Sequence, residues 1–447
     1  MELAIHWFRR DLRLEDNRAL DEALQSGFPV QCIFIFDTYI LEKLEDEDDA
    51  RVSFLHQRLV ELHIQLKERG SSLKVYHGKP EIVWAQLLSD FRVKLVFASH
   101  DYESYGMQRD QRISAFLAEQ GIGFSTFKDC VIFEKSEVVK DDGKPYTVFT
   151  PYSKKWKKSI EENTFYNYSE GLKNGHFHKI EIPFTITLEE LGFKASKVRI
   201  PDAVVHENLI RNYARDRNYP GISGTSRLGI HLRFGTISVR SLARQASSLN
   251  ETFLNELIWR DFYHQILHHF PQVEKRSFKP AYESIQWLNN ESDFQKWCKG
   301  ETGYALVDAG MRELNASGFM HNRVRMVVAS FLCKHLLIDY RWGEAWFARK
   351  LLDFELASNN GGWQWACGSG TDAAPYFRIF NPHEQLKKFD EKLQYVTKRA
   401  PEYLEISAPK PMIDHAFARN RCLETYKKAL SNAEGLGVVA QAEPDSE

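Results

Sequence analysis

Short apolar segments alternate with longer amphipathic ones over the first 134 residues. Segments rich in β-branched and aromatic residues, a composition typical of strands, lie at 2–8, 28–37, 73–78, 95–100 and about 126–133. Between them, apolar residues recur with helical spacing at about 16–26, 49–69, 80–91 and 107–120. Strands that alternate with helices indicate a doubly wound parallel sheet, which binds ligands at the carboxyl ends of its strands. We therefore predict an α/β domain over residues 1–134.

The loop after the first predicted strand argues against one kind of ligand site. Residues 9–14, Arg-Arg-Asp-Leu-Arg-Leu, contain no Gly-x-Gly-x-x-Gly. That glycine motif lets the backbone approach a pyrophosphate closely, so we do not expect an ordinary dinucleotide site in this domain.

The pattern changes after the predicted sheet. Residues 135–200 are mixed and polar, and we interpret them as an interdomain connector. They include Tyr-Ser-Lys-Lys-Trp-Lys-Lys at 152–158, which is either a solvated helix face or a segment that faces phosphate or another domain. From 201 onward the helical period dominates and strand patterns nearly vanish, which predicts a large all-helical domain over 201–430. Residues 431–447 are small and acidic, and we expect a frayed tail.

Composition limits the class of protein. A chain of 447 residues that is 43% hydrophobic can build two or three domains. The net charge of -2 does not indicate a nucleic-acid binder, so such a site would have to be a local basic patch. The six cysteines are scattered without a Cys-x-x-Cys pair, which predicts neither a zinc site nor disulfides. Without a long apolar run or a signal peptide, we expect a cytoplasmic monomer with no membrane association.

Two segments of the helical part carry groups that could bind a ligand. In Gly-Thr-Ser-Arg-Leu at 224–228, glycine and hydroxyl residues at a helix start suit a phosphate, although ordinary capped helices share this pattern. Further on, Glu256, Trp259 and Arg260 lie at i, i+3 and i+4, on one helical face. These three residues indicate either a binding surface or a surface salt bridge beside a half-buried indole.

Two later segments are richer in polar and aromatic groups. Asn322 and Met326 share a helical face with Arg323 beside them, which suits a flat heteroaromatic ligand but also fits an amphipathic helix. Residues 353–365 hold two acids, several amides, a glycine pair and two tryptophans. Packing alone does not require such a set, so this segment favours a functional site.

Five segments together resemble the photolyase/cryptochrome family. They are Ile-His-Trp-Phe-Arg-Arg-Asp-Leu-Arg-Leu at 5–14, Gly-Thr-Ser-Arg-Leu at 224–228, Glu-x-x-Trp-Arg-Asp-Phe-Tyr at 256–263, Met-His-Asn-Arg at 320–323 and Asn-Asn-Gly-Gly-Trp-Gln-Trp at 359–365. They occur in family order, and the resemblance runs from residue 2 to about 400. The chain is most similar to bacterial class I-type photolyases that repair cyclobutane pyrimidine dimers.

The resemblance implies an FAD cofactor in the helical domain. Arg325 and Asp353 would form an ion pair against the isoalloxazine, and Asn359 would face its N5. Glu355 stands at a position near the flavin where an aspartate is common in the family. The residues implied to hold FAD are Tyr213, Thr225, Ser226, Arg227, Leu228, Arg260, Arg325, Asp353, Glu355 and Asn359. Light would drive electron transfer from reduced FAD to a dimer, so no hydrolytic machinery is expected.

The resemblance also implies a site for damaged DNA. A flipped-out dimer would stack on Trp259 and Trp365, Glu256 and Asn322 would bond its edges, and Met326 would form a wall. Backbone phosphates would lie on Arg217, Arg323 and Arg378. Relatives that repair (6-4) photoproducts carry a His-His pair at the position of His321-Asn322. The resemblance therefore implies that this chain acts on cyclobutane dimers.

Light harvesting and photoreduction carry further expectations. Family members use a relay of three tryptophans, whose ends match Trp363 and Trp287, whereas the middle position is Tyr340. A detour through Trp342 or Trp346 is therefore our hypothesis. The positions that resemble an antenna site are Arg51, Asp101 and Glu103. They do not choose between a folate, a deazaflavin and an empty site, and surface charge is their alternative interpretation.

Two rival functions stay open on the sequence alone. A cryptochrome, which senses light on the same fold, is the first, although the pocket residues favour repair. The second is a nucleotide-binding α/β domain joined to a helical interaction module, which would carry no flavin.

Overall fold

The computed structural model describes residues 1–162 and 165–435, and the end of the predicted tail, 436–447, lies outside them. The chain forms two compact units, and each is built from separate segments. The first comprises Met1–Glu134, Ser159–Val204 and Leu228–Ser248. The second comprises Lys135–Lys158, Val205–Arg227 and the chain from Leu249 onward. The predicted connector is therefore shared between the two units.

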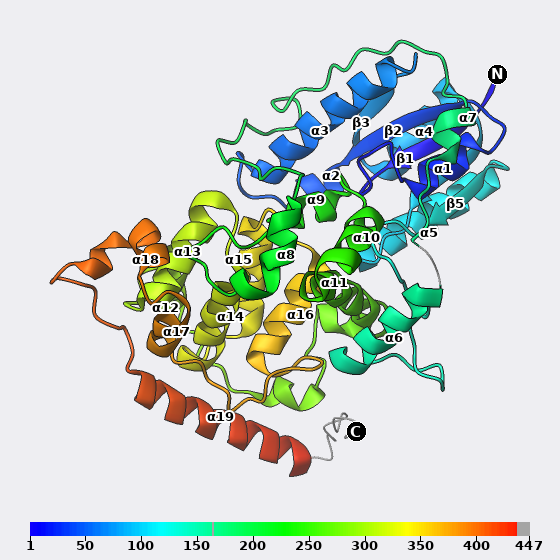
Figure 1. Cartoon of the computed structure of the whole chain (residues 1–447). Coiled ribbons are helices and arrows are strands. Elements are labelled where there is room, and N and C mark those ends of the chain that lie inside the picture. The colour runs from blue at the N-terminus through cyan, green and yellow to red at the C-terminus, as the bar shows by residue number, and fades with distance from the viewer. Residues whose placement is uncertain (163–164, 436–447) are drawn as a thin grey trace. The chain divides into compact units, whose positions relative to one another are not determined.

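A five-stranded parallel sheet forms the centre of the first unit, with strand order β3-β2-β1-β4-β5 (Figure 1). The strands are β1 (Glu2–Phe8), β2 (Val30–Asp37), β3 (Leu73–Gly78), β4 (Arg92–Ser99) and β5 (Gly123–Phe127). The helices are α1 (Arg18–Leu24), α2 (Thr38–Leu41), α3 (Ala50–Lys67), α4 (Pro80–Asp90), α5 (Ser104–Glu119), α7 (Glu170–Asn174), α9 (Gly229–Phe234) and α10 (Val239–Leu249). The predicted doubly wound α/β fold is confirmed.

Both faces of the sheet are covered, because side chains alternate along a strand. On one face Ala4 and Phe8 of β1 pack in a core to which α1 and α3 contribute. On the other face Ile5 and Trp7 pack in a core with residues of α4 and α5. Burial on both sides explains why the strand segments are apolar throughout.

The prediction of the fifth strand was wrong in position. The segment 126–133 was expected as a strand, but β5 ends at Phe127. Cys130 and Val131 lie beyond it and pack with Tyr102 in a small buried cluster. Their apolar side chains are buried from a loop, without strand pairing, and sequence pattern alone does not separate these two cases.

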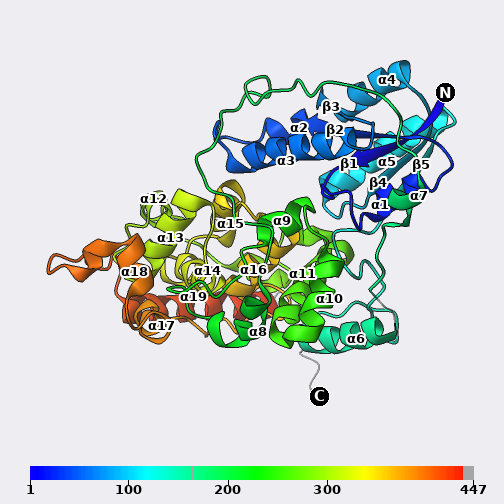
Figure 2. The same ribbon diagram turned by 45° about the horizontal axis from the view of Figure 1, so that its top comes forward.

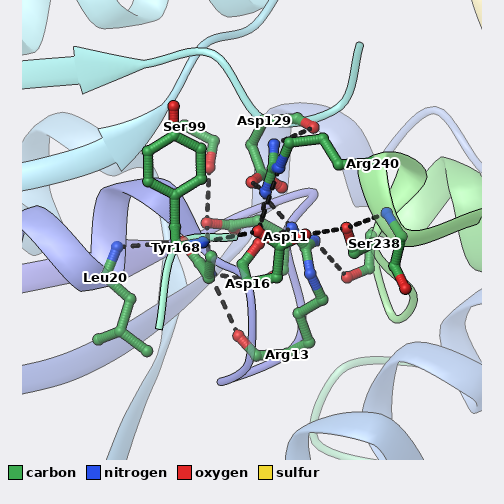
Figure 3. Close-up of polar contacts among 12 residues, drawn as sticks. Asp11, Arg13, Asp16, Leu20, Ser99, Asp129, Tyr168, Ser238 and Arg240 are labelled. Carbon is green, nitrogen blue, oxygen red and sulfur yellow. Dashed lines mark hydrogen bonds and ion pairs between the residues drawn. The ribbon is translucent and has the colours of Figure 1, made fainter. Parts of the chain in front are cut away.

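Buried ion pairs hold the loop after β1 to α10 and its N-terminal flank (Figure 3). Asp129 Oδ1 accepts from Arg13 Nη2 at 2.8 Å and from Arg240 Nη2 at 2.9 Å. Arg240 Nε also donates to Asp16 Oδ1 at 3.1 Å, and Ser238 donates to the other oxygen of Asp16. Burial opposes the charge of Asp129, but the two arginines outweigh it and lower the pKa of this carboxyl.

The second unit is helical, but it does not match the predicted domain over 201–430, because residues 201–204 and 228–248 belong to the first unit. Its helices are α6 (Phe149–Glu162), α8 (Glu207–Asp216), α11 (Glu251–His269), α12 (Glu291–Lys299), α13 (Ala305–Ser317), α14 (Asn322–Ser330), α15 (Tyr340–Lys350), α16 (Leu356–Cys367), α17 (Pro382–Phe389), α18 (Gln394–Arg399) and α19 (His415–Gly435). Shorter turns lie at Pro271–Glu274, Pro280–Ser284, Phe331–His335 and Pro401–Leu404. No helix among residues 1–162 and 165–435 is long and apolar enough to cross a membrane.

Helix α16 lies between α11 and α14 in both views and packs against each of them (Figure 1 and Figure 2). Close approach depends on glycines: a methyl group on Gly361 would overlap the ring of Tyr263 on α11, and one on Gly343 of α15 would overlap Trp363. The lysine-rich segment of α6 is anchored by Trp156, which is buried and donates to Asp261 at 2.9 Å. The segment is therefore not only a solvated face.

Candidate functional site

A cavity of about 380 Å³ opens in the helical unit and gathers side chains from α11, α14, α15, α16 and the segment before α16. The predicted site residues that line it are Arg217, Glu256, Trp259, Arg260, Asn322, Arg325, Met326, Asp353, Glu355, Asn359, Trp363 and Trp365. Segments separated by up to 148 positions, Arg217 to Trp365, thus meet at one cavity. Its volume lies within the range of small-molecule sites.

The α11 face supplies the acid, the indole and the guanidinium that helical spacing placed together. The side chain of Asn250 caps the start of α11 and accepts hydrogen bonds from the backbone nitrogens of Thr252 and Phe253. This cap fixes where the helix begins. Trp259 lies flat on Phe149, with ring centroids 3.7 Å apart and planes at 3°. One face of this indole is therefore covered by protein, and the ring is held in place beside the cavity.

Glu256 is paired with Arg217 at the cavity wall. Burial raises the pKa of Glu256, and the nearby guanidinium of Arg217 opposes that shift only in part. The predicted role of Arg217 in binding phosphate stays a prediction, and the structure adds this ion pair with a cavity carboxyl.

A second ion pair is buried in the wall of the cavity. Arg260 Nη2 donates to Glu355 Oε1 at 2.6 Å, and both side chains have less than a tenth of their surface exposed. His264 Nε2 lies 3.5 Å from the same oxygen, while His264 Nδ1 lies 2.9 Å from the backbone oxygen of Arg260. Removal of either charged partner would remove a buried ion pair and is expected to destabilise this wall of the cavity.

The third pair is the one expected against a flavin ring. Arg325 Nη2 donates to both carboxylate oxygens of Asp353, at 2.9 and 3.1 Å, and Arg325 Nε donates to the backbone oxygen of Met320 at 2.8 Å. The arginine is therefore fixed at both ends of its guanidinium. The predicted pairing is present, and both residues line the cavity.

The start of α14 places Asn322 at the cavity. His321 Nδ1 accepts from the backbone nitrogen of Arg323 at 3.1 Å and so caps the helix. Burial and neighbouring arginines lower the pKa of His321 to about 4, which keeps its ring neutral and able to accept. Arg323 itself does not line the cavity: it donates to Asn218 at 2.7 Å, and its guanidinium lies over the ring of Phe389.

Three amides of α16 divide into two roles. Asn359 lines the cavity, and its Nδ2 donates to the backbone oxygen of Glu344 at 3.1 Å. Asn360 and Gln364 instead donate to the backbone oxygen of Val273, at 2.9 and 3.1 Å, and hold α16 in place. Asn360 also donates to the Glu344 carboxyl at 3.0 Å, and burial raises the pKa of that carboxyl to about 7.

Other predicted residues lie away from the cavity lining. Tyr213 is buried against Phe253, with ring centroids 5.0 Å apart, and Arg227 lies over the ring of Phe319. Arg378 is exposed. The predicted cofactor and relay residues outside the lining are Tyr213, Thr225, Ser226, Arg227, Leu228, Trp287 and Tyr340.

The predicted antenna residues are only partly brought together. Asp101 and Glu103 both face Arg10, at 3.7 and 2.8 Å, beside the carboxyl ends of β1 and β4. Arg51 at the start of α3 pairs with Asp49, which also caps that helix.

Sequence reasoning missed several lining residues. They are Tyr263, Ala329, Phe347, Leu351, Phe354, Ser358 and Gly362. A signal existed for Tyr263, which follows Trp259 by four positions on α11 and therefore shares its face. The sequence shows Gly362 only as part of a glycine pair with Gly361, and of these two glycines Gly362 lines the cavity.

Comparison with known proteins gives a consistent relationship. A family model for DNA photolyase matches residues 4–167, and a model for the FAD binding domain of DNA photolyase matches residues 253–408. The deoxyribodipyrimidine photo-lyase of Alkalihalophilus pseudofirmus is 35% identical over 465 residues, which cover 94% of this chain and 97% of the relative. The chain belongs to the DNA photolyase family and contains its FAD-binding domain.

Solved structures agree with that assignment. A bacterial class III photolyase from Agrobacterium tumefaciens has a TM-score of 0.84 and 30% identity, and the match covers 96% of this chain and 98% of the other. An archaeal photolyase from Sulfolobus tokodaii, solved with two FAD molecules, has a TM-score of 0.83 and 32% identity over 96% of this chain and all of the other.

Proposed function

We propose that this chain repairs cyclobutane pyrimidine dimers in DNA with light, as a deoxyribodipyrimidine photo-lyase. The observation that carries the proposal is the single cavity that joins two groups of residues. The Arg325–Asp353 pair and Asn359 suit a flavin, whereas Glu256 and Asn322 suit pyrimidine edges. Electron transfer between two ligands is faster when they lie close together, and residues suited to each ligand line the same cavity.

The cavity residues fit the isoalloxazine of FAD. Because the Asn359 nitrogen donates to Glu344, the amide oxygen is the group that Asn359 offers a ligand, and it can accept from the N5–H of reduced flavin. A methyl group on Gly362 would meet no atom within 4 Å, so α16 leaves space there for a flat ring. Bound reduced FAD, excited by light, would supply the electron for repair and take it back.

The indoles and polar groups would receive the dimer. Trp259, held by Phe149, and Trp365 offer ring faces, and stacking returns about 1–3 kcal/mol per base. The raised pKa of Glu256 makes its protonated, hydrogen-donating form more accessible, and Asn322 supplies an amide. Both groups would steady negative charge on the pyrimidine carbonyls while the two carbon–carbon bonds of the cyclobutane ring open. Met326 would form the wall.

The remaining predicted contacts belong to the same proposal. Tyr213, Arg260, Glu355 and residues 225–228 would support FAD, and the exposed Arg378 would bind backbone phosphate together with Arg323 and Arg217. Asp101, Glu103 and Arg51 would line the site of a second chromophore, a folate or a deazaflavin. We also propose that the protein acts in the cytoplasm, which its six buried free cysteines support, and that it is a monomer.

Illumination of the flavin-loaded, chemically reduced protein with dimer-containing single-stranded DNA tests the proposal. We expect blue light to restore intact pyrimidines, measured by their recovered absorbance, and the same sample in the dark to restore none. Flavin binding without light-dependent loss of dimers would contradict repair and favour a light sensor on the same fold.

A further inference from the structure

Tyr340 is poorly suited to carry a positive charge between the cavity and the surface. It is 2% exposed, and the guanidinium of Arg341 lies 4.8 Å from its ring centroid. Burial raises the pKa of the phenol, so the proton that a tyrosine releases on oxidation is strongly held. A cation over the ring further disfavours loss of an electron from that ring.

A different aromatic residue meets the cavity tryptophan. Trp297 on α12 lies edge-on to Trp363, with ring centroids 6.1 Å apart and planes at 69°. Phe347, which lines the cavity, contacts both indoles, at 5.0 Å from Trp363 and 6.2 Å from Trp297. Trp297 has no exposed surface and therefore cannot itself exchange electrons with solutes.

The surroundings of Trp297 suit an oxidised indole. Its Nε1 donates to the backbone oxygen of Val328 at 3.1 Å, and a carbonyl acceptor stabilises an indole that carries positive charge. Its ring neighbours Phe294, Phe347 and Trp363 are uncharged.

From Trp297 the aromatic contacts continue toward the surface. Phe294 stacks on Trp297 at 5.8 Å and 18°, and Trp342 meets Phe294 edge-on at 5.2 Å. Trp342 is partly exposed and can receive an electron from solution. Trp346, one turn further along α15, differs because Arg349 and Lys350 lie over its ring at 5.8 and 5.4 Å.

We propose that Trp363, Trp297 and Trp342 form the relay that photoreduces the flavin of this chain, with Phe294 as the bridge between the last two. The proposal rests on the proposed function only in that FAD binds at the cavity. Trp363 gives an electron to photoexcited oxidised FAD, Trp297 refills Trp363, and Trp342 refills Trp297. A thiol in solution refills Trp342 and is oxidised. Two such transfers with one proton from solvent account for the reduced cofactor.

Four phenylalanine variants of the flavin-loaded protein test the relay, because phenylalanine keeps an aromatic ring in the core but is not oxidised by flavin. Oxidised protein is illuminated with excess dithiothreitol, and the loss of oxidised-flavin absorbance is timed. We expect Trp297→Phe and Trp342→Phe to slow photoreduction by about tenfold or more, and the controls Tyr340→Phe and Trp346→Phe to stay within about twofold of the wild type.

Transient absorption adds a reading that a packing defect would not change. In Trp342→Phe the positive charge stops at Trp297, closer to the flavin, so the tryptophan radical should recombine faster than in the wild type. Because Trp342 is partly exposed, its variant keeps the test decisive even if Trp297→Phe fails to fold.

The outcomes separate this relay from the function itself. Photoreduction that is slowed as much in Tyr340→Phe as in Trp297→Phe, or a Trp342→Phe variant with wild-type photoreduction and radical lifetime, would overturn the relay. Dimer repair by the dithionite-reduced wild type bypasses the relay altogether. Failure of that repair would therefore reject the proposed function and leave the relay to be judged on photoreduction.

Discussion

The side-chain nitrogen of Asn359 donates to the backbone oxygen of Glu344, so one helix fixes which end of an amide its neighbour presents to the cavity. If the amide oxygen accepts from the N5–H of reduced flavin, its removal should weaken binding of reduced FAD more than that of oxidised FAD. We expect Asn359→Ala to lower the two-electron midpoint potential by about 30 mV, the equivalent of a tenfold loss. Spectroelectrochemical titration of the holoprotein measures it.

Asn360→Ala is the matched control for that variant. Asn360 does not line the cavity, and it holds Val273 and Glu344. Its loss should reduce the free energy of unfolding by about 1–3 kcal/mol and leave the midpoint potential near the wild-type value. Equal potentials for Asn359→Ala and the wild type would refute the role of the amide oxygen.

The adjacent glycines of α16 should respond in opposite ways. Gly362→Ala adds a methyl group where no atom lies within 4 Å, so it should stabilise the unloaded protein by about 0.5–1 kcal/mol through helix propensity. Gly361→Ala places the methyl group in the ring of Tyr263 and should destabilise it by about 1–3 kcal/mol. Urea unfolding of both variants measures the difference.

A larger group at the open position should block the ligand. Gly362→Leu is expected to fold but to lose most of its flavin, as read from the ratio of flavin to protein absorbance. Normal flavin content in that variant would show that the cofactor does not lie against this part of α16.

Glu344 should give the protein a pH-dependent stability. Its pKa of about 7 in the folded state exceeds the ordinary value of 4.5, so the folded state binds the proton more tightly than the unfolded state. This contribution is fully present below pH 4.5 and is lost as the pH rises to 7, with an upper limit of about 3 kcal/mol. Glu344→Gln should lack that loss when wild type and variant are compared by urea unfolding between pH 5 and pH 8. Parallel curves would contradict it.

The buried network of the first unit makes Arg240 a stability residue. Arg240→Met leaves Asp129 and Asp16 without one of their cations and should reduce the free energy of unfolding by about 3–5 kcal/mol. The double variant with Asp129→Asn should be destabilised by less than the sum of the single changes, because the two residues share one interaction. Additive effects would indicate that the pair is not coupled.

The fold followed from the sequence more completely than the site. The spacing of apolar residues located most helices and strands. Burial of one or two faces of an element leaves a periodic pattern of apolar residues in its sequence. The fifth strand was displaced because Cys130 and Val131 are buried from a loop. Helical spacing also showed that Glu256, Trp259 and Arg260 share a face, and the cavity contains all three.

Pairings between distant residues could not be predicted in that way. Nothing local shows that Arg217 meets Glu256, or that Glu344 on α15 holds the amides of α16. Likewise, Trp297 carried no signal beyond that of a core residue, and only its contact with Trp363 gives it a role. Such pairings depend on how helices separated by tens of residues pack together.

The segmented build of the first unit restricts how this chain can recombine with a relative. A single crossover after residue 134 would take Asp129 from one parent and Arg240 from the other. The loop and the helix that these residues join would then come from different proteins. An exchange that keeps this unit intact has to carry Ser159–Val204 and Leu228–Ser248 as well. For evolution and for chimera design alike, the heritable module is therefore a set of three segments rather than one stretch of chain.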